Sequence, residues 1–491
     1  MHLYSLDLSA RTRRHACFSV TLAALVAAVP EAHALPDLTW STYYGADPSD
    51  AVNDVDFDVW GELVSVGYTF SESEIAGGDA FDPDYDGDAD GFVTKFDAFG
   101  DQVWGTYLGG SGPDYLHSVA SDANDGIIVV GVTSSTSDIA TIGADQTILS
   151  GTSDGMVAKY DGEGELQWAT YIGGNGVDGA RGVCLAADGT IYVVGRTTSN
   201  SGLAVGTVHD STFNGVQDAF VAKLASVDGD VLWTTYFGGN GTTEAFDCAV
   251  DSNGNIFVTG YTNATDIATV GTHDAGANGG QDAFLAKFTS SGGRSWATFY
   301  GGAGDDHGNA VIVDGSNNVY IAGDTKSANG GLSLLIATTA DTSLDGTQDA
   351  FVAKFSNGGV RSWGRYFGGA PGGFEYEGFY DLEVFATGLY LSGRTTSSGL
   401  ATANAFDATH GGGYSDAVFV AIDATNGSLF HASYLGGTSY DAGHGVAIRI
   451  GEAAIGGTTG SPSGVATAGA HDATYDDGYD GLIAWIHLFD V

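Results

Sequence analysis

The clearest chemical motif in the sequence is a run of aspartates at every second position. A glycine follows the last aspartate of the run, and a further aspartate stands where a twelve-residue calcium loop has its final ligand. Several carboxylate oxygens that converge from a tightly turned loop are what a hard cation such as Ca²⁺ requires. The motif therefore predicts a Ca²⁺ cofactor, with these metal ligands: Asp84, Asp86, Asp88, Asp90 and Asp97.

The residues that follow this motif limit the kind of calcium site. A β-strand is predicted from Phe92, so the loop cannot lie between two helices as it does in an EF-hand. A solvated acidic loop without an ion is the open alternative. Asp476, Asp477 and Asp480 form a looser version of the same pattern near the end of the chain.

Two further patterns match motifs of enzymes, but their neighbours do not suit catalysis. Residues 151–155 fit the G-x-S-x-G pattern of hydrolases, and residues 174–179 fit the G-x-G-x-x-G pattern of dinucleotide sites. The first motif needs a helix after it and the second needs a βαβ unit, whereas strands are predicted after both. We therefore expect no catalytic residues and no organic cofactor at these motifs.

The charge of the chain argues against one class of partner. Among 491 residues, 61 are acidic and 16 are basic, which gives a formal net charge of −45. Nucleic-acid binding needs Lys and Arg to neutralise phosphates, so we expect no nucleic-acid partner. With 43% hydrophobic residues and only 7 prolines, the chain has the composition of a folded protein with a core.

Residues 1–34 have the pattern of a removed signal peptide. Arg11, Arg13 and Arg14 precede an apolar run at 16–29, and residues 32–34 supply a small-x-small cleavage pattern. No later apolar stretch approaches the length of about 20 residues that spans a bilayer, so no membrane span is expected. We predict an exported domain of residues 35–491 that is extracellular, on the cell surface or periplasmic.

Two sequence markers recur along this domain, and both count seven repeats. One is an aromatic strand that ends in a glycine pair, and the other reads D-A-F-V-A-K-F in its commonest form. A fixed internal period of this kind identifies a repeat architecture. The first marker begins at Trp40, Trp104, Trp168, Trp233, Trp296, Trp363 and His431, and the second at Asp90, Asp154, Asp218, Asp282, Asp349, Asp416 and Asp480.

Each repeat reads as four short strands. In one of them the strands are predicted at 117–121, 127–132, 154–160 and 165–171, with turn residues between them and no helical periodicity. The pattern predicts an all-β fold, a seven-bladed β-propeller with four-stranded antiparallel blades. The domain starts with an outermost-type strand at 39–44 and ends with a third-type strand at 480–488. We therefore expect the N-terminal strand to pair with the C-terminal blade and close the ring.

The motifs of the repeat resemble a known family. W-x-T-Y-x-G-G, D-x-x-G-x-I-Y-V-x-G-x-T and D-A-F-V-A-K-F follow one another almost whole between residues 168 and 224. This order is similar to that of the bacterial seven-bladed beta-propeller repeat (SBBP) family, and the resemblance implies an exported or cell-surface protein without an established chemistry. The acidic loop at 84–90 is likewise similar to the calcium loops of integrin-type propellers.

The two cysteines that follow the signal peptide are Cys184 and Cys248. When their repeats are aligned on Gly195 and Gly260, the cysteines fall one position apart on equivalent strands. Side chains alternate between the two faces of a strand, so the two thiols are expected on opposite faces. We therefore predict two buried thiols and no disulfide.

The predicted topology places the aspartate-rich connections at one end of the ring. These are the loops from strand four to the next strand one and from strand two to strand three. Asx turns explain most of these aspartates, and cation binding is the alternative. A second repeated charge is a lysine that we expect to pair with a carboxylate: Lys95, Lys159, Lys223, Lys287 and Lys354.

These features predict a binding or structural scaffold that acts through an acidic loop face. The expected partner is an extracellular protein or a glycan, and the expected state is a monomer. An enzyme is the alternative, either a carbohydrate-active hydrolase or lyase with carboxylates near the channel, or a quinone-dependent dehydrogenase, because residues 228–233 are similar to the tryptophan-docking turn of quinoproteins. A deep pocket of unlike polar groups would favour an enzyme, and seven equivalent loops would favour a scaffold.

Overall fold

The computed structural model describes residues 36–489 except 47, 78–79, 207, 329–342, 370–375 and 477. These residues belong to one compact unit, Leu35–Val491. The predicted signal peptide, 1–34, lies outside the described residues. Every regular element in the described part is a β-strand, and this part contains no helix with the length and apolar character needed to cross a bilayer.

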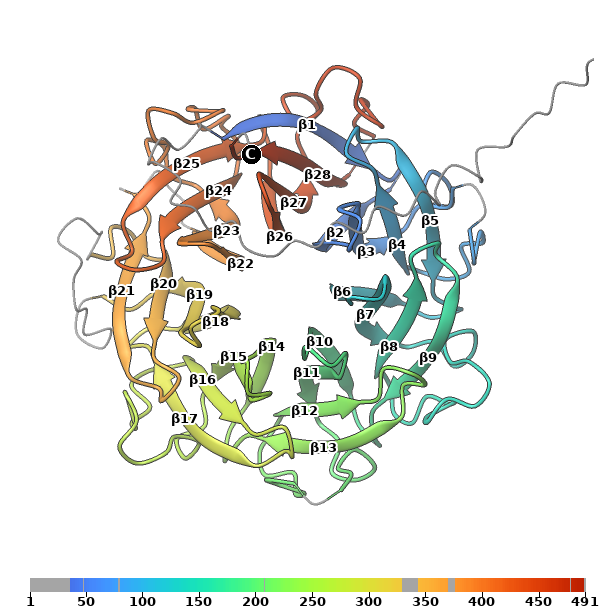
Figure 1. Ribbon diagram of the computed structural model, residues 1–491, viewed down its shortest axis with the longest axis vertical. Helices are drawn as coiled ribbons and strands as arrows, with labels where there is room; N and C mark the ends of the chain where they lie inside the picture. Colours follow the sequence, from blue (N-terminus) through green and yellow to red (C-terminus); the bar gives the residue numbers. More distant parts are fainter. Residues whose placement is uncertain are drawn as a thin grey trace, which may run out of the picture. The chain divides into compact units, whose positions relative to one another are not determined.

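The described strands form seven four-stranded antiparallel sheets, which stand around a common axis as the blades of a propeller (Figure 1). The predicted fold class is therefore confirmed. In blades 1 to 6 the innermost strand comes first in the chain and the outermost comes last. Blades 1 and 2 consist of β2 (Asp50–Phe57), β3 (Leu63–Thr69), β4 (Asp90–Phe96) and β5 (Gln102–Leu108), and of β6 (Asp114–Ser121), β7 (Gly126–Thr133), β8 (Asp154–Asp161) and β9 (Leu166–Ile172).

The following four blades repeat this order. Blade 3 consists of β10 (Asp178–Leu185), β11 (Ile191–Thr197), β12 (Asp218–Leu224) and β13 (Val231–Phe237), and blade 4 of β14 (Thr243–Val250), β15 (Ile256–Thr262), β16 (Asp282–Phe288) and β17 (Arg294–Tyr300). Blade 5 consists of β18 (Asp306–Val313), β19 (Val319–Thr325), β20 (Asp349–Phe355) and β21 (Arg361–Phe367), and blade 6 of β22 (Gly378–Phe385), β23 (Gly388–Thr395), β24 (Asp416–Asp423) and β25 (Leu429–Leu435).

Blade 7 joins the two ends of the chain. It contains β26 (Asp441–Arg449), β27 (Glu452–Thr459) and β28 (Asp480–His487), and its outermost strand is β1 (Asp37–Tyr44). β1 pairs antiparallel with β28, from Asp37 opposite His487 to Tyr44 opposite Gly481, and the two strands lie side by side at the rim in Figure 1. The expected closure by the N-terminal strand is confirmed, and it leaves no blade with a missing outer strand.

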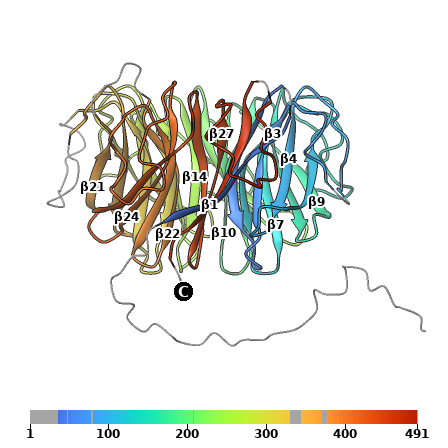
Figure 2. The ribbon, with the colours of Figure 1, turned by 90° about the horizontal axis from the view of Figure 1, so that it is seen from above.

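The strands run between two ends of the ring (Figure 2). The connections between strands one and two and between strands three and four of each blade lie at one end, which we call the hairpin end. The connections from strand two to strand three and from one blade to the next lie at the other, the loop end. Strands β6 to β9 match the strands predicted for the same repeat to within three residues at each boundary.

Tryptophans of the outermost strands hold neighbouring blades together at the hairpin end. Gly164, in the hairpin after β8, has a φ of 85°, and a Cβ atom there would lie 2.8 to 3.1 Å from the Trp104 ring of the preceding blade. Trp104 Nε1 donates a hydrogen bond to the Gly162 carbonyl of the same hairpin at 3.1 Å. Only glycine combines this backbone with this contact, and the arrangement recurs for Trp40 with Gly100, Trp168 with Gly229, Trp233 with Gly292, Trp296 with Gly359 and Trp363 with Gly427.

The repeated lysines also lie at the hairpin end. Lys95 pairs with Asp58 at 2.5 Å and Lys159 with Asp122 at 2.7 Å, and Lys287 lies 3.7 Å from Asp251. The expected pairing with carboxylates is confirmed for these three. Lys223 and Lys354 instead donate to backbone carbonyls of the following blade, so all five positions serve the packing of one blade on the next.

Candidate functional site in the central channel

The innermost strands carry one bulge each, at the same place in all seven blades. The ladder with the second strand skips a single residue of each innermost strand. A bulge leaves its extra residue out of the ladder and re-aims the side chain. All seven side chains are half-buried, and they differ from blade to blade: Asn53, His117, Arg181, Phe246, Asn309, Tyr380 and His444.

Bulge residues of neighbouring blades contact one another around the channel. Arg181 Nη1 lies 2.8 Å from His117 Nε2, and the rings of Tyr380 and His444 stack with centroids 5.6 Å apart. Burial, with the charge of Arg181 as a second cause, lowers the pKa of His117 to about 3, so His117 is neutral at physiological pH. The repeat framework thus carries a ring of unlike side chains inside the channel.

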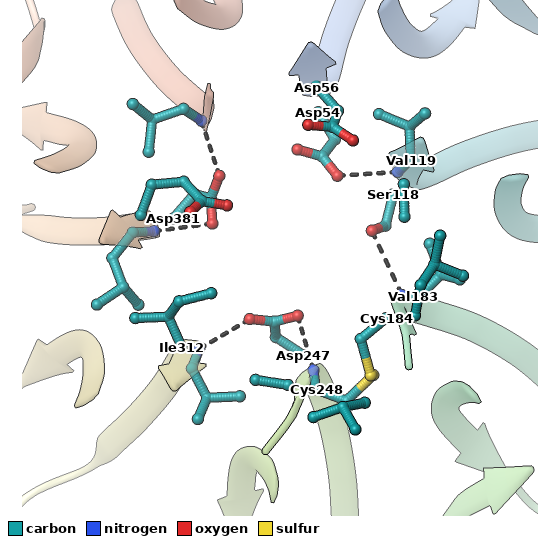
Figure 3. A pocket seen from close by; sticks show the side chains of 18 of the residues that line it. Asp54, Asp56, Ser118, Val119, Val183, Cys184, Asp247, Cys248, Ile312 and Asp381 are labelled. Atoms are coloured by element: carbon teal, nitrogen blue, oxygen red, sulfur yellow. Dashed lines mark hydrogen bonds between the residues drawn. A yellow bond between two sulfur atoms is a disulfide. The ribbon is translucent and has the colours of Figure 1, made fainter. Parts of the chain in front are cut away.

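A cavity of about 250 Å³ lies next to this ring, and residues of all seven innermost strands line it (Figure 3). Its polar groups are mainly carboxylates, and no described residue of its lining is Lys, Arg or His. The carboxylates come from three blades: Asp54 and Asp56 from β2, Asp247 from β14, and Asp381 and Glu383 from β22.

Four of these carboxylates connect neighbouring blades: Asp56 accepts the Ser121 N–H of the next blade at 2.7 Å, and the other three share one pattern. Asp247 accepts hydrogen bonds from the backbone N–H of Cys248 in its own strand and of Val311 in the next blade, both at 2.7 Å. Asp54 and Asp381 stand at the equivalent position and accept the same pair of N–H groups from their own and the following blade at 2.7 to 2.9 Å. Each innermost strand pairs with only one other strand of its blade. The hydrogen bonds between blades therefore stabilise the wall of the channel.

Burial governs the protonation of the channel carboxylates. It raises the pKa of Asp247 to about 8, with the charge of Asp381 as a second cause. It raises the pKa of Asp56 and of Asp381 to about 6, and it raises the pKa of Glu383 well above its usual range. Carboxyl groups of this kind can hold protons or attract a cation. Their backbone hydrogen bonds serve the structure of the channel.

The innermost strands of blades 3 and 4 meet at a seam without such a carboxylate bridge. A disulfide between Cys184 and Cys248 joins them instead (Figure 3). The prediction of two separate thiols is therefore wrong. Alternation does place the cysteines on opposite faces of their own blades, and Val183 and Ala249 beside them point away from this seam into other clusters. Opposite faces of consecutive blades meet at the seam, so the two Cα atoms lie 5.8 Å apart. Gly182 stands here where Asp54, Asp247 and Asp381 bridge other seams.

At the loop end, the mouth of the channel carries further unlike groups. Glu244 is buried, lies 2.9 Å from Arg181 and 3.9 Å from Arg196, and accepts a hydrogen bond from the Tyr261 hydroxyl at 3.2 Å. In the next blade, His307 lies 3.0 Å from Asp324, and its ring centroid lies 5.3 Å from that of Tyr261. Equivalent positions of other blades hold different residues, so the sevenfold repeat breaks down at the mouth.

A row of tyrosines lies at the loop end of blades 6 and 7. We call Tyr376, Tyr414, Tyr440 and Tyr479 the tyrosine row; their neighbouring ring centroids lie 5.8, 6.3 and 5.6 Å apart in that order. Tyr376, Tyr414 and Tyr479 are 39%, 44% and 48% exposed. The Arg394 guanidinium lies 5.2 Å from the centre of the Tyr376 ring and 5.7 Å from that of Tyr440, a cation–π arrangement.

The repeat motifs do not predict the tyrosine row, because its four tyrosines belong to neither of the two repeat markers. Each stands one or two residues before the first or third strand of a blade, where blades 1 to 5 carry no aromatic residue. A comparison of the repeats that looked for departures from the pattern would have found them. Similarly, the bulge residues differ in type at every blade except for two Asn and two His.

The structure places the five predicted calcium ligands in two separate regions. Asp84, Asp86 and Asp88 are exposed in the loop before β4, and Asp90 is buried at the start of that strand, where its Oδ2 accepts the Asp86 N–H at 2.8 Å. Asp97 lies beyond the other end of β4 and accepts the N–H of Phe99 in a hairpin turn. A strand of this length spans about 20 Å, so Asp97 is not brought together with the others. Calcium at this loop stays a prediction.

The second predicted acidic pattern lies in the corresponding loop of blade 7. Asp480 Oδ2 accepts the Asp476 N–H at 3.1 Å, and Asp477 lies outside the described residues. Asp476 also belongs to a group with Asp472 and Glu74 whose carboxylate oxygens lie within 4.8 Å of one another, the one such group of three ligating side chains among residues that the structure describes. The sequence pattern did not point to Glu74 because that residue comes from blade 1.

The fold and the channel define a seven-bladed β-propeller whose repeated framework surrounds a mouth of non-repeated residues. The chain carries a beta-propeller repeat of the SBBP type: the family model matches residues 232–268, which confirms the resemblance of the repeat motifs. Regulatory protein FlaEY of Caulobacter vibrioides is 28% identical over 347 residues, which are 66% of this chain and 34% of that protein. The chain thus spans about a third of the length of this relative.

Several solved structures are similar to this one at low sequence identity and with TM-scores below 0.5. The Pan2 WD40 domain of Neurospora crassa is 10% identical with a TM-score of 0.46, over 93% of this chain and 98% of that one. Hydrazine synthase of Kuenenia stuttgartiensis is 10% identical with a TM-score of 0.44, over 87% of this chain and 96% of that one. Quinohemoprotein alcohol dehydrogenase of Comamonas testosteroni is 12% identical with a TM-score of 0.40, over 92% of this chain and 76% of that one.

Proposed function

We propose that this protein is an exported or cell-surface scaffold that binds an extracellular protein at the loop end of its channel. The observation that carries the proposal is the tyrosine row with Arg394, which is exposed and occurs on only two of the seven blades. Tyrosine and arginine dominate the energetically important residues of protein interfaces. Tyrosine also supplies a large contact area at a low loss of conformational entropy.

Two features support a location outside the cytoplasm. The predicted signal peptide would direct the chain to export. The disulfide between Cys184 and Cys248 suits an oxidising compartment, since disulfides persist there and are rare in reducing cytosol. A binding module is also compatible with the regulatory role named for the Caulobacter relative.

The charge of the protein limits the kind of surface that its partner can have. A formal net charge of −45 would attract a partner with a basic surface and repel an acidic one. Attraction of this kind acts mainly on the rate of association and weakens as salt rises. Calcium at the loop of Asp84, Asp86, Asp88 and Asp90 belongs to the same proposal, because a bound cation would offset part of the negative charge at the loop end.

A defined peptide library tests this function. Residues 35–491 are screened against displayed random peptides and, in parallel, against a glycan array. We expect selected peptides to be rich in Lys or Arg and to lose about tenfold or more in affinity for the Tyr414→Ser variant, the loss typical of a hot-spot residue. Phe99→Ser is the control, because Phe99 is 84% exposed at the opposite, hairpin end.

Two possible results of the same screen would contradict the proposal. Peptides that bind Tyr414→Ser as well as the parent would place the partner elsewhere on the molecule. Saturable glycan binding that Tyr414→Ser abolishes, without any selected peptide, would identify the tyrosine row as a sugar site and overturn the protein partner.

A further inference from the structure

The aspartates that begin the third strands share a feature that their role as loop caps does not explain. Asp154 is fully buried at the start of β8, and its Oδ2 accepts hydrogen bonds from the Ser150 N–H at 2.8 Å and from Gln146 Nε2 at 2.7 Å. Its Oδ1 is also buried but accepts no hydrogen bond. The same orphaned Oδ1 recurs in Asp90, Asp218, Asp282, Asp416 and Asp480.

The junction of blades 2 and 3 carries a second orphaned carboxylate oxygen, on Asp178. Asp178, the first residue of β10, is fully buried, and its N–H donates to the carbonyl of Ser153, the neighbour of Asp154, at 2.8 Å. Oδ2 of Asp178 accepts hydrogen bonds from the Gly174 N–H at 2.7 Å and the Ser199 hydroxyl at 2.6 Å. Its Oδ1 is buried without a partner.

Backbone carbonyl oxygens complete this oxygen-rich junction. A Cβ atom on Gly151, three residues before Asp154, would meet the carbonyl oxygens of Gly176 and Gly174, the latter at 3.1 Å. The loop that carries both carbonyls reads G-G-x-G-x-D at residues 173–178. That order also begins the nonapeptide that binds Ca²⁺ in β-helical repeat proteins. Asn175 in this loop is exposed, so the loop lies at the surface.

Two buried carboxylates with no positive partner are energetically unfavourable unless a cation or hydrogen bonds compensate them. We infer that the junction of blades 2 and 3 binds one Ca²⁺ ion through the Asp154 and Asp178 carboxylates and the carbonyl oxygens of Gly174 and Gly176. All four groups are oxygen ligands, which suit Ca²⁺ and not the nitrogen and sulfur preference of Zn²⁺.

The junction of blades 1 and 2 repeats the arrangement only in part. Asp90 takes the place of Asp154 and has a buried Oδ1 without a hydrogen bond, whereas Asp114, in the place of Asp178, accepts hydrogen bonds from the Thr133 and Ser135 hydroxyls. A Cβ atom on Gly87 would meet the Gly110 carbonyl, the Gly112 carbonyl at 2.9 Å and Asp90 Oδ1 at 3.1 Å. The second carboxylate of this junction is therefore compensated within the protein, and we assign no ion to it.

Other junctions satisfy the second acidic group without an ion. Asp306 Oδ1 accepts a hydrogen bond from the Thr325 hydroxyl, and Asp441 Oδ1 accepts one from the Thr459 hydroxyl at 2.5 Å. Between blades 3 and 4, Thr243 replaces the aspartate and its hydroxyl lies 2.9 Å from that of Thr262. Asp218 therefore has no carboxylate at the position equivalent to Asp178, which makes it a matched control.

Calorimetric titration of Ca²⁺ into chelator-treated residues 35–491 tests the inference, which does not rest on the proposed partner. We expect Asp178→Asn to bind one equivalent of Ca²⁺ fewer than the parent and Asp218→Asn to bind the same number. Asn keeps the size and one acceptor oxygen of Asp, so the loop hydrogen bonds to Oδ2 have a replacement. Asp86→Asn separates the predicted acidic loop from the junctions, because Asp86 is not a junction ligand.

Thermal unfolding gives a second measurement that does not depend on counting ions. Ca²⁺ should raise the melting temperature of the parent and of Asp218→Asn equally, and that of Asp178→Asn by less, because binding to the folded state alone stabilises it. The inference is overturned by an absence of saturable, chelator-sensitive binding in the parent. It is also overturned if Asp178→Asn folds and binds the full number of ions, or if Asp86→Asn alone lowers that number.

Discussion

Reduction of the Cys184–Cys248 disulfide should lower the stability of the propeller by an amount that follows from the loop it closes. The bond joins residues 64 apart in the sequence. Chain-entropy arguments give a stabilisation of about 4 kcal/mol for a loop of this size. An unfolding entropy of about 2 cal/mol/K per residue gives about 1 kcal/mol/K for a unit of this length, so reduction should lower the melting temperature by about 4 °C.

Scanning calorimetry with and without a phosphine reductant measures this shift, and alkylation followed by mass spectrometry confirms that both thiols are released. The control is the double variant Cys184→Ala with Cys248→Ala, in which the reductant should change nothing. An unchanged melting temperature in fully reduced parent protein would refute the argument that this seam depends on the bond. Alkylation of both cysteines in denatured, unreduced protein would refute the bond itself.

Two other predictions concern the hairpins and the channel. Gly164→Ala should lose about 1 to 3 kcal/mol more unfolding free energy than Gly143→Ala in urea denaturation. Both glycines have a positive φ, but only the new methyl group at 164 would meet the Trp104 ring. Equal losses in the two variants would contradict this packing. Because burial raises the pKa of Asp247 to about 8, its contribution to stability is fully present below about pH 4 and is lost as the pH rises through 8. Asp247→Asn should therefore lose less unfolding free energy between pH 5 and pH 9 than the parent, and an equally steep loss would contradict the raised pKa.

The blade architecture was predictable from the sequence because each blade needs the same residues at the same places. Trp104 and the residues of the following hairpin form one interlocking contact, so a change in either is tolerated poorly and both leave a periodic trace. The closing strand was predictable for a related reason. The first repeat has an extra outermost-type strand, and the last repeat lacks one. In a closed ring the first strand can complete the last blade, as β1 does by pairing with β28.

The candidate site was harder to predict, since it depends on contacts between repeats. The alternation argument for Cys184 and Cys248 was correct within each blade, but it did not consider that facing sides of consecutive blades meet. Asp97 was grouped with Asp90 from spacing alone, whereas the intervening β4 carries it to the other end of the blade. The bulge in each innermost strand also leaves no clear sequence signal, because its residue type is different in nearly every blade.

The seven bulge positions allow the residues that face the channel to vary while the strand pairing of the blades stays the same. A side chain that stands outside the ladder contributes little to pairing between strands, so its replacement leaves the Trp contacts, the closing strand and the bridges of the channel wall in place. Single substitutions at these positions can therefore change the lining of the channel. For protein engineering, these positions form a compact library on a rigid and covalently reinforced frame.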